Sequence, residues 1–88
     1  MNRERRKQIA VAREKIDGIA ADIQAAIEAL QEIRDDEEGA RDGLPASLQE
    51  GERAQQMQAS IDALEEAIAA LESFDADDIG ETLERAAA

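Results

Sequence analysis

The chain has 88 residues and a formal net charge of −12, with no Cys, no His and one aromatic residue, Phe74. The absence of Cys and His excludes disulfides and the common zinc, haem and thiol chemistries. No apolar run approaches the roughly 20 residues of a membrane span, and one aromatic residue is too few for base stacking. We expect a single small cytoplasmic domain with no cofactor, no metal and no membrane partner.

Most of the basic residues lie near the N-terminus. Residues 1–15 hold six basic and two acidic side chains, a net charge of +4, whereas residues 16–88 hold four basic and twenty acidic ones, a net charge of −16. In an antiparallel hairpin the basic start of the chain would lie beside its acidic end, and the opposite charges would pair. We therefore expect pairing within the chain and no direct contact with nucleic acid.

A heptad apolar pattern runs through residues 2–41. Two sets of residues recur every seven positions: Ile9, Ile16, Ile23 and Leu30, and between them Ala12, Ile19, Ala26 and Ile33. This pattern predicts one amphipathic helix about 60 Å long with a coiled-coil seam. Ile27 lies beside the seam and widens the apolar face, which favours more than two helices around one core.

The turn is predicted at residues 42–47. Two glycines are typical of a helix C-terminus there, and Pro45 pushes its predecessor out of the α region. Ser47 and Glu50 form a capping-box pattern, which would start the second helix at about residue 48. The alternative is a short turn followed by a helix that starts near Glu52.

The second helix is predicted over about 48–74. Its apolar residues step by four and three: Met57, Ile61, Leu64, Ile68 and Leu71. Past Phe74 an aspartate-rich run interrupts this spacing, and Ile79, Leu83 and Ala86 take up a new helical spacing. A short third helix over about 76–86 is expected, with a kinked continuation of the second helix as the alternative. The predicted fold is all-α: one domain over residues 1–88, built as a long antiparallel helical hairpin, coiled-coil-like, with a short C-terminal helix.

Two helices of this kind cannot bury both apolar stripes by themselves, so we expect the hairpin to assemble into an oligomeric helical bundle. The chain itself is therefore one predicted partner. The predicted oligomer interface combines the two stripes: Ile9, Ile16, Ile19, Ile23, Ile27, Leu30, Ile33, Met57, Ile61, Leu64, Ile68 and Leu71.

The segment LPASLQEGER at residues 44–53 and the segment IDALEEAI at residues 61–68 resemble small acidic helical-hairpin proteins of phages and prophages. The resemblance covers about residues 28–72, and Gly51 stands where those proteins would have Ser. It implies a non-catalytic protein in the cytoplasm of an infected or lysogenic bacterium. Such a protein would capture a host factor, or sequester a small anionic, nucleotide-like host immune signal.

One group of residues near the predicted turn is suited to an anionic ligand. Its members are three arginines and two small residues: Arg34, Arg41, Arg53, Ser47 and Gly51. Guanidinium groups and the free amides of a helix N-terminus both bind phosphate and carboxylate. The competing interpretation is that these arginines pair with neighbouring carboxylates. In an oligomer, side chains from several hairpins would converge on one pocket.

Other patterns give catalysis little support. A di-iron bundle needs His ligands, and carboxylate pairs at helical spacing arise by chance when 22 of 88 residues are acidic. The run from Asp75 to Gly80 resembles the start of an EF-hand loop but fails at its fifth and twelfth positions, so helix capping is favoured over a weak cation contact. Two alternative functions stay open: an acidic nucleic-acid mimic that inhibits a DNA- or RNA-binding host protein, and a purely structural assembly protein.

Overall fold

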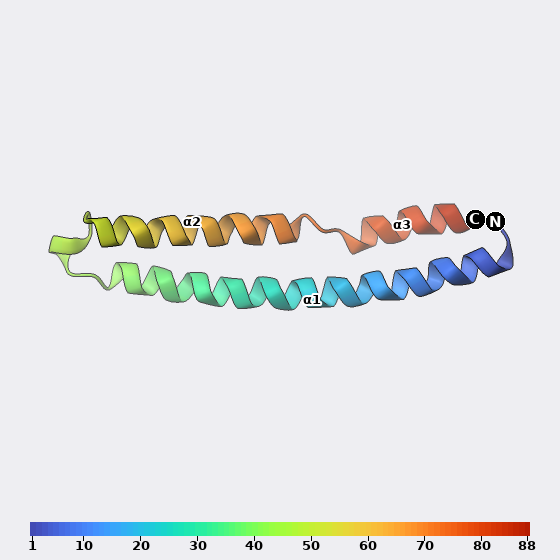
Figure 1. Ribbon diagram of the computed structural model, residues 1–88, viewed down its shortest axis with the longest axis horizontal. Coiled ribbons are helices and arrows are strands. Elements are labelled where there is room, and N and C mark those ends of the chain that lie inside the picture. The colour runs from blue at the N-terminus through green and yellow to red at the C-terminus, as the bar shows by residue number, and fades with distance from the viewer.

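The computed structural model describes all 88 residues as an elongated helical hairpin, 69 × 15 × 13 Å in extent, with no strand. Helix α1, Arg3–Asp42, forms one arm. The second arm consists of α2, Glu52–Glu72, and α3, Ala76–Ala87, which lie end to end along α1 (Figure 1). A 3₁₀ turn, Ala46–Leu48, lies at the turn end, and both chain termini lie together at the opposite, terminal end.

The predicted all-α hairpin with a short third helix is confirmed, but the turn differs from the prediction. The second helix begins at Glu52, the alternative start, because Gly51 is its N-cap and residues 46–48 form a separate 3₁₀ turn. The predicted capping box is wrong. Ser47 lies inside the 3₁₀ turn, where its hydroxyl caps no helix. The N-cap of α2 has no side chain at all, so its first amides have no side-chain cap.

Gln49 holds the turn together in place of the predicted box. Its Nε2 lies 2.7 Å from the carbonyl oxygen of Leu44, 3.3 Å from that of Arg41 and 3.4 Å from that of Asp42. The last carbonyls of a helix have no partner within the helix. The two N–H groups of this amide are shared among the three carbonyls, and they hold the loop against the end of α1.

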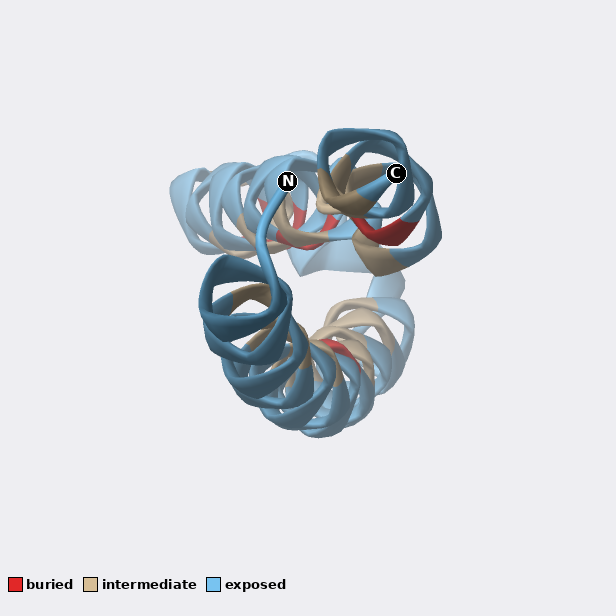
Figure 2. Ribbon diagram, turned by 90° about the vertical axis from the view of Figure 1, so that its right-hand side faces the viewer, coloured by how far each residue is buried: buried red, intermediate tan, exposed pale blue.

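Burial identifies the face of each helix that meets the other arm, which we call the seam. In α1 the main buried or half-buried residues alternate by four and three: Ile9, Arg13, Ile16, Ala20, Ile23, Ile27, Leu30, Arg34, Glu37 and Arg41. In α2 they are Ala54, Met57, Ile61, Leu64, Ile68 and Leu71. Both patterns are heptads. The buried residues face the space between the two arms (Figure 2).

The seam of α1 contains only one of the two sets of apolar residues that were predicted to form the stripe. Ala12, Ile19, Ala26 and Ile33 are all exposed, Ile19 by 49% and Ile33 by 53%. The residues one position further along turn inward instead, with Ile27 only 5% exposed. This rotation of α1 also brings Arg13, Arg34 and Arg41 into the seam, where their aliphatic stems cover apolar surface while their charged heads reach polar partners.

The break at residues 73–75 corrects the register of the second arm. An unbroken α2 would present polar residues to α1 at the next seam positions: Asp75, Asp78, Thr82 and Arg85. The residues that are buried or half-buried are instead Ala76, Ile79, Gly80, Leu83 and Ala87. Asp75 starts the new helix by accepting a hydrogen bond from the amide of Asp78 at 3.0 Å, which confirms its predicted capping role. Ala87 takes the inward position that had been predicted for Ala86.

Because only five residues are buried, each one carries a large share of the core. We expect Ile61→Ala, at a side chain that is 1% exposed, to lower the free energy of unfolding by about 2–4 kcal/mol. Val11→Ala is the matched control, because Val11 is 52% exposed and its truncation should change stability by less than about 0.5 kcal/mol. Urea unfolding followed by circular dichroism measures both. Equal effects of the two substitutions would contradict the assigned seam.

Candidate binding surfaces

Arg13 joins α1 to α3 near the terminal end. Its Nη1 lies 2.6 Å from Oε1 of Glu84, and its guanidinium covers Gly80, where an added Cβ would meet guanidinium atoms at 3.0–3.2 Å. The hydrogen bond to Glu84 and the charge of that carboxylate raise the pKa of Arg13 above its ordinary value. Arg13 is therefore charged at every physiological pH, and this contact depends on geometry rather than on titration of the arginine.

The basic start of α1 is partly satisfied within the hairpin. Arg6 donates from Nε to the carbonyl oxygen of Ala87 at 2.9 Å, and the N-terminal amine lies 3.5 Å from the carbonyl oxygen of Ala88. Cations beside the last carbonyls of a helix are favourable. The expected pairing within the chain is confirmed for Arg13 and Glu84. The remaining basic side chains at the start of α1 form no ion pair: Arg3, Arg5, Lys7 and Lys15.

At the turn end Arg41 connects the two arms. Its Nη1 donates to Oε1 of Gln58 on α2, and its Nη2 lies 3.0 Å from Oδ1 of Asp42. Gln58 donates in turn to Oδ1 of Asp62 at 2.8 Å. The half-buried guanidinium of Arg41 is thus part of a polar chain that crosses the seam. Because its N–H groups are used in this chain, the guanidinium has little capacity to bind a further anion.

The other predicted anion-binding residues lie around this end without converging. Arg34 pairs with Asp35 at 3.1 Å, and Arg53 is exposed in the first turn of α2 with no ion pair. Ser47 is exposed in the 3₁₀ turn, and Gly51 is the N-cap of α2. No pocket lies among these residues in the single chain. Pairing with neighbouring carboxylates is confirmed for Arg34 and Arg41, and anion binding here stays a prediction.

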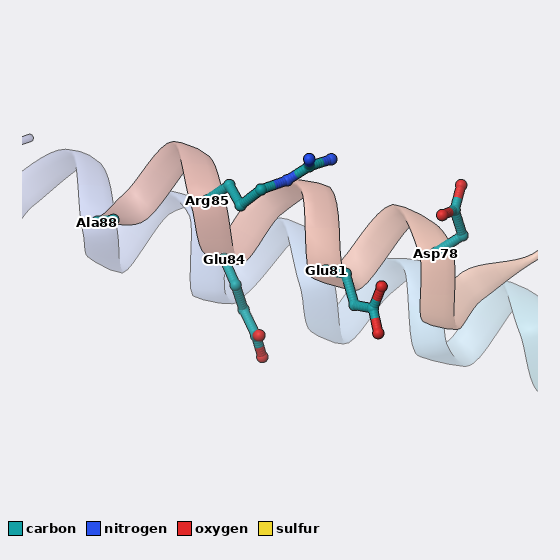
Figure 3. Close-up of a pocket in the computed structure, with 5 residues that line it drawn as sticks. All are labelled: Asp78, Glu81, Glu84, Arg85 and Ala88. Atoms are coloured by element: carbon teal, nitrogen blue, oxygen red, sulfur yellow. The ribbon is translucent and has the colours of Figure 1, made fainter.

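A depression of about 620 Å³ lies along α3 (Figure 3). Five residues line it, all exposed: Asp78, Glu81, Glu84, Arg85 and Ala88. Figure 3 shows Glu84 and Arg85 on opposite sides of the helix. One helix supplies the whole lining, so the depression offers a ligand no enclosed space. Nowhere in the chain do three acidic side chains gather in a way that would hold a metal ion.

Charge is distributed unevenly along the hairpin. Residues 18–74 hold fourteen acidic and three basic side chains, a net charge of −11, and we call them the acidic segment. Residues 1–17 and 75–88 together hold eight acidic and seven basic side chains, a net charge of −1. The whole chain contains only three ion pairs, so most carboxylates of the acidic segment have no cation beside them.

The two sides of the hairpin that flank the seam also differ. One side, which we call the polar side, carries amides and carboxylates: Asp17, Gln24, Gln31 and Glu38 from α1, and Gln58, Glu65 and Glu72 from α2. The opposite, apolar side carries exposed Ile, Ala and Ser at the flanking positions: Ala12, Ile19, Ala26 and Ile33 from α1, and Ser60 and Ala67 from α2. Arg5 and Arg53 occupy the same positions at its two ends, and Ala63 and Ala70 of α2 lie one position further from the seam. These assignments follow from the seam, because antiparallel heptads place equivalent flanking positions on the same side.

The sequence predicted that the basic side chains near the N-terminus, Arg13 among them, pair with the acidic end of the chain, but it did not predict the contact between Arg13 and Gly80. The available signal was the spacing of Arg13, Arg34 and Arg41 by multiples of seven, which places all three on one helix face with Ile27. Gly80 could not have been assigned without the register of the second arm, since only that register places it opposite Arg13.

Comparison with protein-family models, with curated proteins and with solved structures finds no match to this chain. No helix has both the length and the apolar character that crossing a bilayer requires. The acidic segment and the apolar side are the two extended surfaces with a chemistry of their own.

The contact between Arg13 and Gly80 predicts an unusual response to alanine. Replacing Gly by Ala inside a helix ordinarily stabilises it by about 0.5–1 kcal/mol. At Gly80 the new methyl group would displace the Arg13 guanidinium, so we expect Gly80→Ala to leave the Tm unchanged or lower it. Gly18→Ala is the matched control and should raise the Tm, because nothing lies within 4 Å of a Cβ at that position.

A double-mutant cycle separates the two causes. In the Arg13→Ala background, Gly80→Ala should raise the Tm as Gly18→Ala does, because the obstructing side chain is gone. Thermal melts of the wild type, the two single variants and the double variant measure the coupling. An equal gain from Gly80→Ala in both backgrounds would show that Arg13 does not rest on this glycine.

Proposed function

We propose that this chain is a non-catalytic binding protein whose acidic segment docks on a basic surface of a partner protein. The observation that carries the proposal is the net charge of −11 over residues 18–74, with few of the carboxylates paired. A net charge of about 2 to 8 in magnitude is enough to keep a small domain soluble. The total of −12 exceeds that range, although charge repulsion destabilises a compact chain.

The partner class follows from the sign and spread of the charge. Carboxylates along an elongated hairpin resemble the negative surface that a nucleic acid offers, and electrostatic complementarity speeds the encounter of oppositely charged surfaces. Proteins that bind DNA or RNA carry basic surfaces of the matching kind. We therefore favour the nucleic-acid mimic among the functions that the sequence leaves open. The resemblance to small phage proteins would make the partner a bacterial host protein.

Capture of a small anion by Arg34, Arg41, Arg53, Ser47 and Gly51 has less support. Arg34 and Arg41 already bond to Asp35 and Asp42, and the surrounding acidic segment would repel an anion. A second chain would have to complete such a pocket.

The first test compares two charge-matched variants. One neutralises four carboxylates of α2: Asp62→Asn, Glu65→Gln, Glu66→Gln and Glu72→Gln. The other neutralises four near the terminal end: Glu4→Gln, Glu14→Gln, Asp77→Asn and Glu81→Gln. Proteins captured from a bacterial lysate are identified by mass spectrometry, and their affinities are measured by titration calorimetry. We expect a basic nucleic-acid-binding protein whose Kd rises more than tenfold with the first variant and changes little with the second.

Salt and arginine variants complete this test. Raising the salt concentration from about 50 to 200 mM should weaken binding by more than tenfold, while Arg41→Ala and Arg53→Ala should leave it unchanged. An equal loss of affinity in the two charge-matched variants would show that the interaction is non-specific charge attraction, which would contradict the proposal. A small anion that is retained in native mass spectrometry and lost on Arg41→Ala would support anion capture instead.

A further inference from the structure

The apolar side of α1 exposes large side chains that its own hairpin leaves uncovered. Ile19 and Ile33 are 49% and 53% exposed, and Ala12 and Ala26 alternate with them at intervals of seven residues. The second arm continues this side with small residues at positions 60, 63, 67 and 70, all exposed. Between Arg5 and Arg53 at its two ends this side is therefore mainly apolar, whereas the polar side carries amides and carboxylates.

The surface area of the hairpin indicates how much of it a partner would cover. The chain exposes 6386 Å², whereas a compact protein of its 9.6 kDa mass would expose about 5,100 Å². The excess is about 1,300 Å², and a stable interface takes about 600–1,000 Å² from each partner. One partner on the apolar side would bring the exposed area close to that of a compact protein.

We propose that a second copy of this chain covers the apolar side in antiparallel orientation, with α1 against α1 about a two-fold axis, to form a four-helix bundle. The proposal goes beyond the docking of a basic partner and does not depend on it, because it uses the apolar side rather than the carboxylates. It also moves the predicted oligomer contact. Most of the residues expected at an oligomer interface are used within the hairpin, and Ile19 and Ile33 are the large ones left exposed.

Side-chain size favours this arrangement. With the two-fold axis near Asp22, Ile19 faces Ala26 of the second copy, and Ile33 faces Ala12. Each large side chain thus meets a small one, which is how facing helix positions interdigitate. A two-fold axis parallel to the hairpin would place α1 against α2 instead, and would leave this alternation of Ile and Ala in α1 without a counterpart.

Charge favours the same orientation. Antiparallel alignment places the terminal end of one copy, with its unpaired Arg5, beside the acidic turn end of the other. Arg5 lies on the apolar side and comes within about one turn of residues 35–38, all acidic, in the second copy. Parallel alignment would instead set the two acidic segments side by side, and they would repel. Asp22 is the exception, since it meets its own copy at the two-fold axis.

Sedimentation equilibrium tests the surface. We expect the wild type to be a dimer at micromolar concentration and the double variant Ile19→Gln, Ile33→Gln to raise the dimer Kd more than tenfold. Val11→Gln is the matched control, because Val11 is equally exposed but lies off the apolar side. Asp22→Asn should tighten the dimer, and Asp17→Asn on the polar side should do so less. A monomeric wild type, or equal effects of the paired variants, would overturn the proposal.

Disulfide cross-linking tests the orientation, because the natural chain has no Cys. Oxidation of a mixture of Ala12→Cys and Ile33→Cys proteins should give a cross-linked heterodimer, while neither protein alone should cross-link efficiently. A dimer without this cross-link, or one that cross-links Ala12→Cys to itself, would overturn the antiparallel arrangement. These outcomes are independent of the lysate experiment, so failure of one proposal is distinguishable from failure of the other.

Discussion

The single heptad seam between α1 and the second arm is the constraint on which the rest of the structure depends. A two-helix hairpin has one interface and no third layer, so Ile27, Ile61 and Ile68 are the only large residues that become buried. Polar groups have to share this interface, and Arg13 and Arg41 do so by covering apolar surface with their stems and bonding at their heads. The break at residues 73–75 serves the same seam, since it keeps polar residues of α3 out of it.

The periodicity of the sequence predicted the helices well and their rotation poorly. The first helix, expected at residues 2–41, is observed at Arg3–Asp42, because Asn2 caps its start and Gly43 its end. Its inward set at Ile9, Ile16, Ile23 and Leu30, however, has apolar residues beside it at two neighbouring heptad positions. Either the set with Ile19 and Ile33 or the set with Ile27, one position further along, would complete an amphipathic face. The choice between them depends on what α2 and α3 place opposite, and Gly80 beneath Arg13 is part of that choice. The arginine site failed to converge for a related reason, because the rotation carries Arg34 and Arg41 into the seam while Arg53 stays outside.

Antiparallel topology also determines where the net negative charge of this chain is located in the hairpin. The basic start of α1 and the acidic α3 are distant in sequence, yet they lie together and reduce the net charge of the terminal end to −1. The negative charge of residues 18–74 is not compensated in this way, because the basic residues there are few. Two of them bond to adjacent carboxylates, and most of the other carboxylates have no cation beside them. The fold thus converts an overall acidic composition into a molecule with a nearly neutral end and an acidic remainder.

The two proposed interactions are compatible in one assembly. Contact between apolar sides would bury Ile19 and Ile33 and leave the polar side, with Glu38, Glu65 and Glu72, on the outside of the bundle. Two copies would then present two acidic segments pointing in opposite directions, each beside the nearly neutral terminal end of the other copy. A partner with a basic surface would meet the carboxylates of α2 at both ends of the bundle. Pairing of the chains would therefore remove the exposed apolar surface without consuming the charge that a basic partner would recognise.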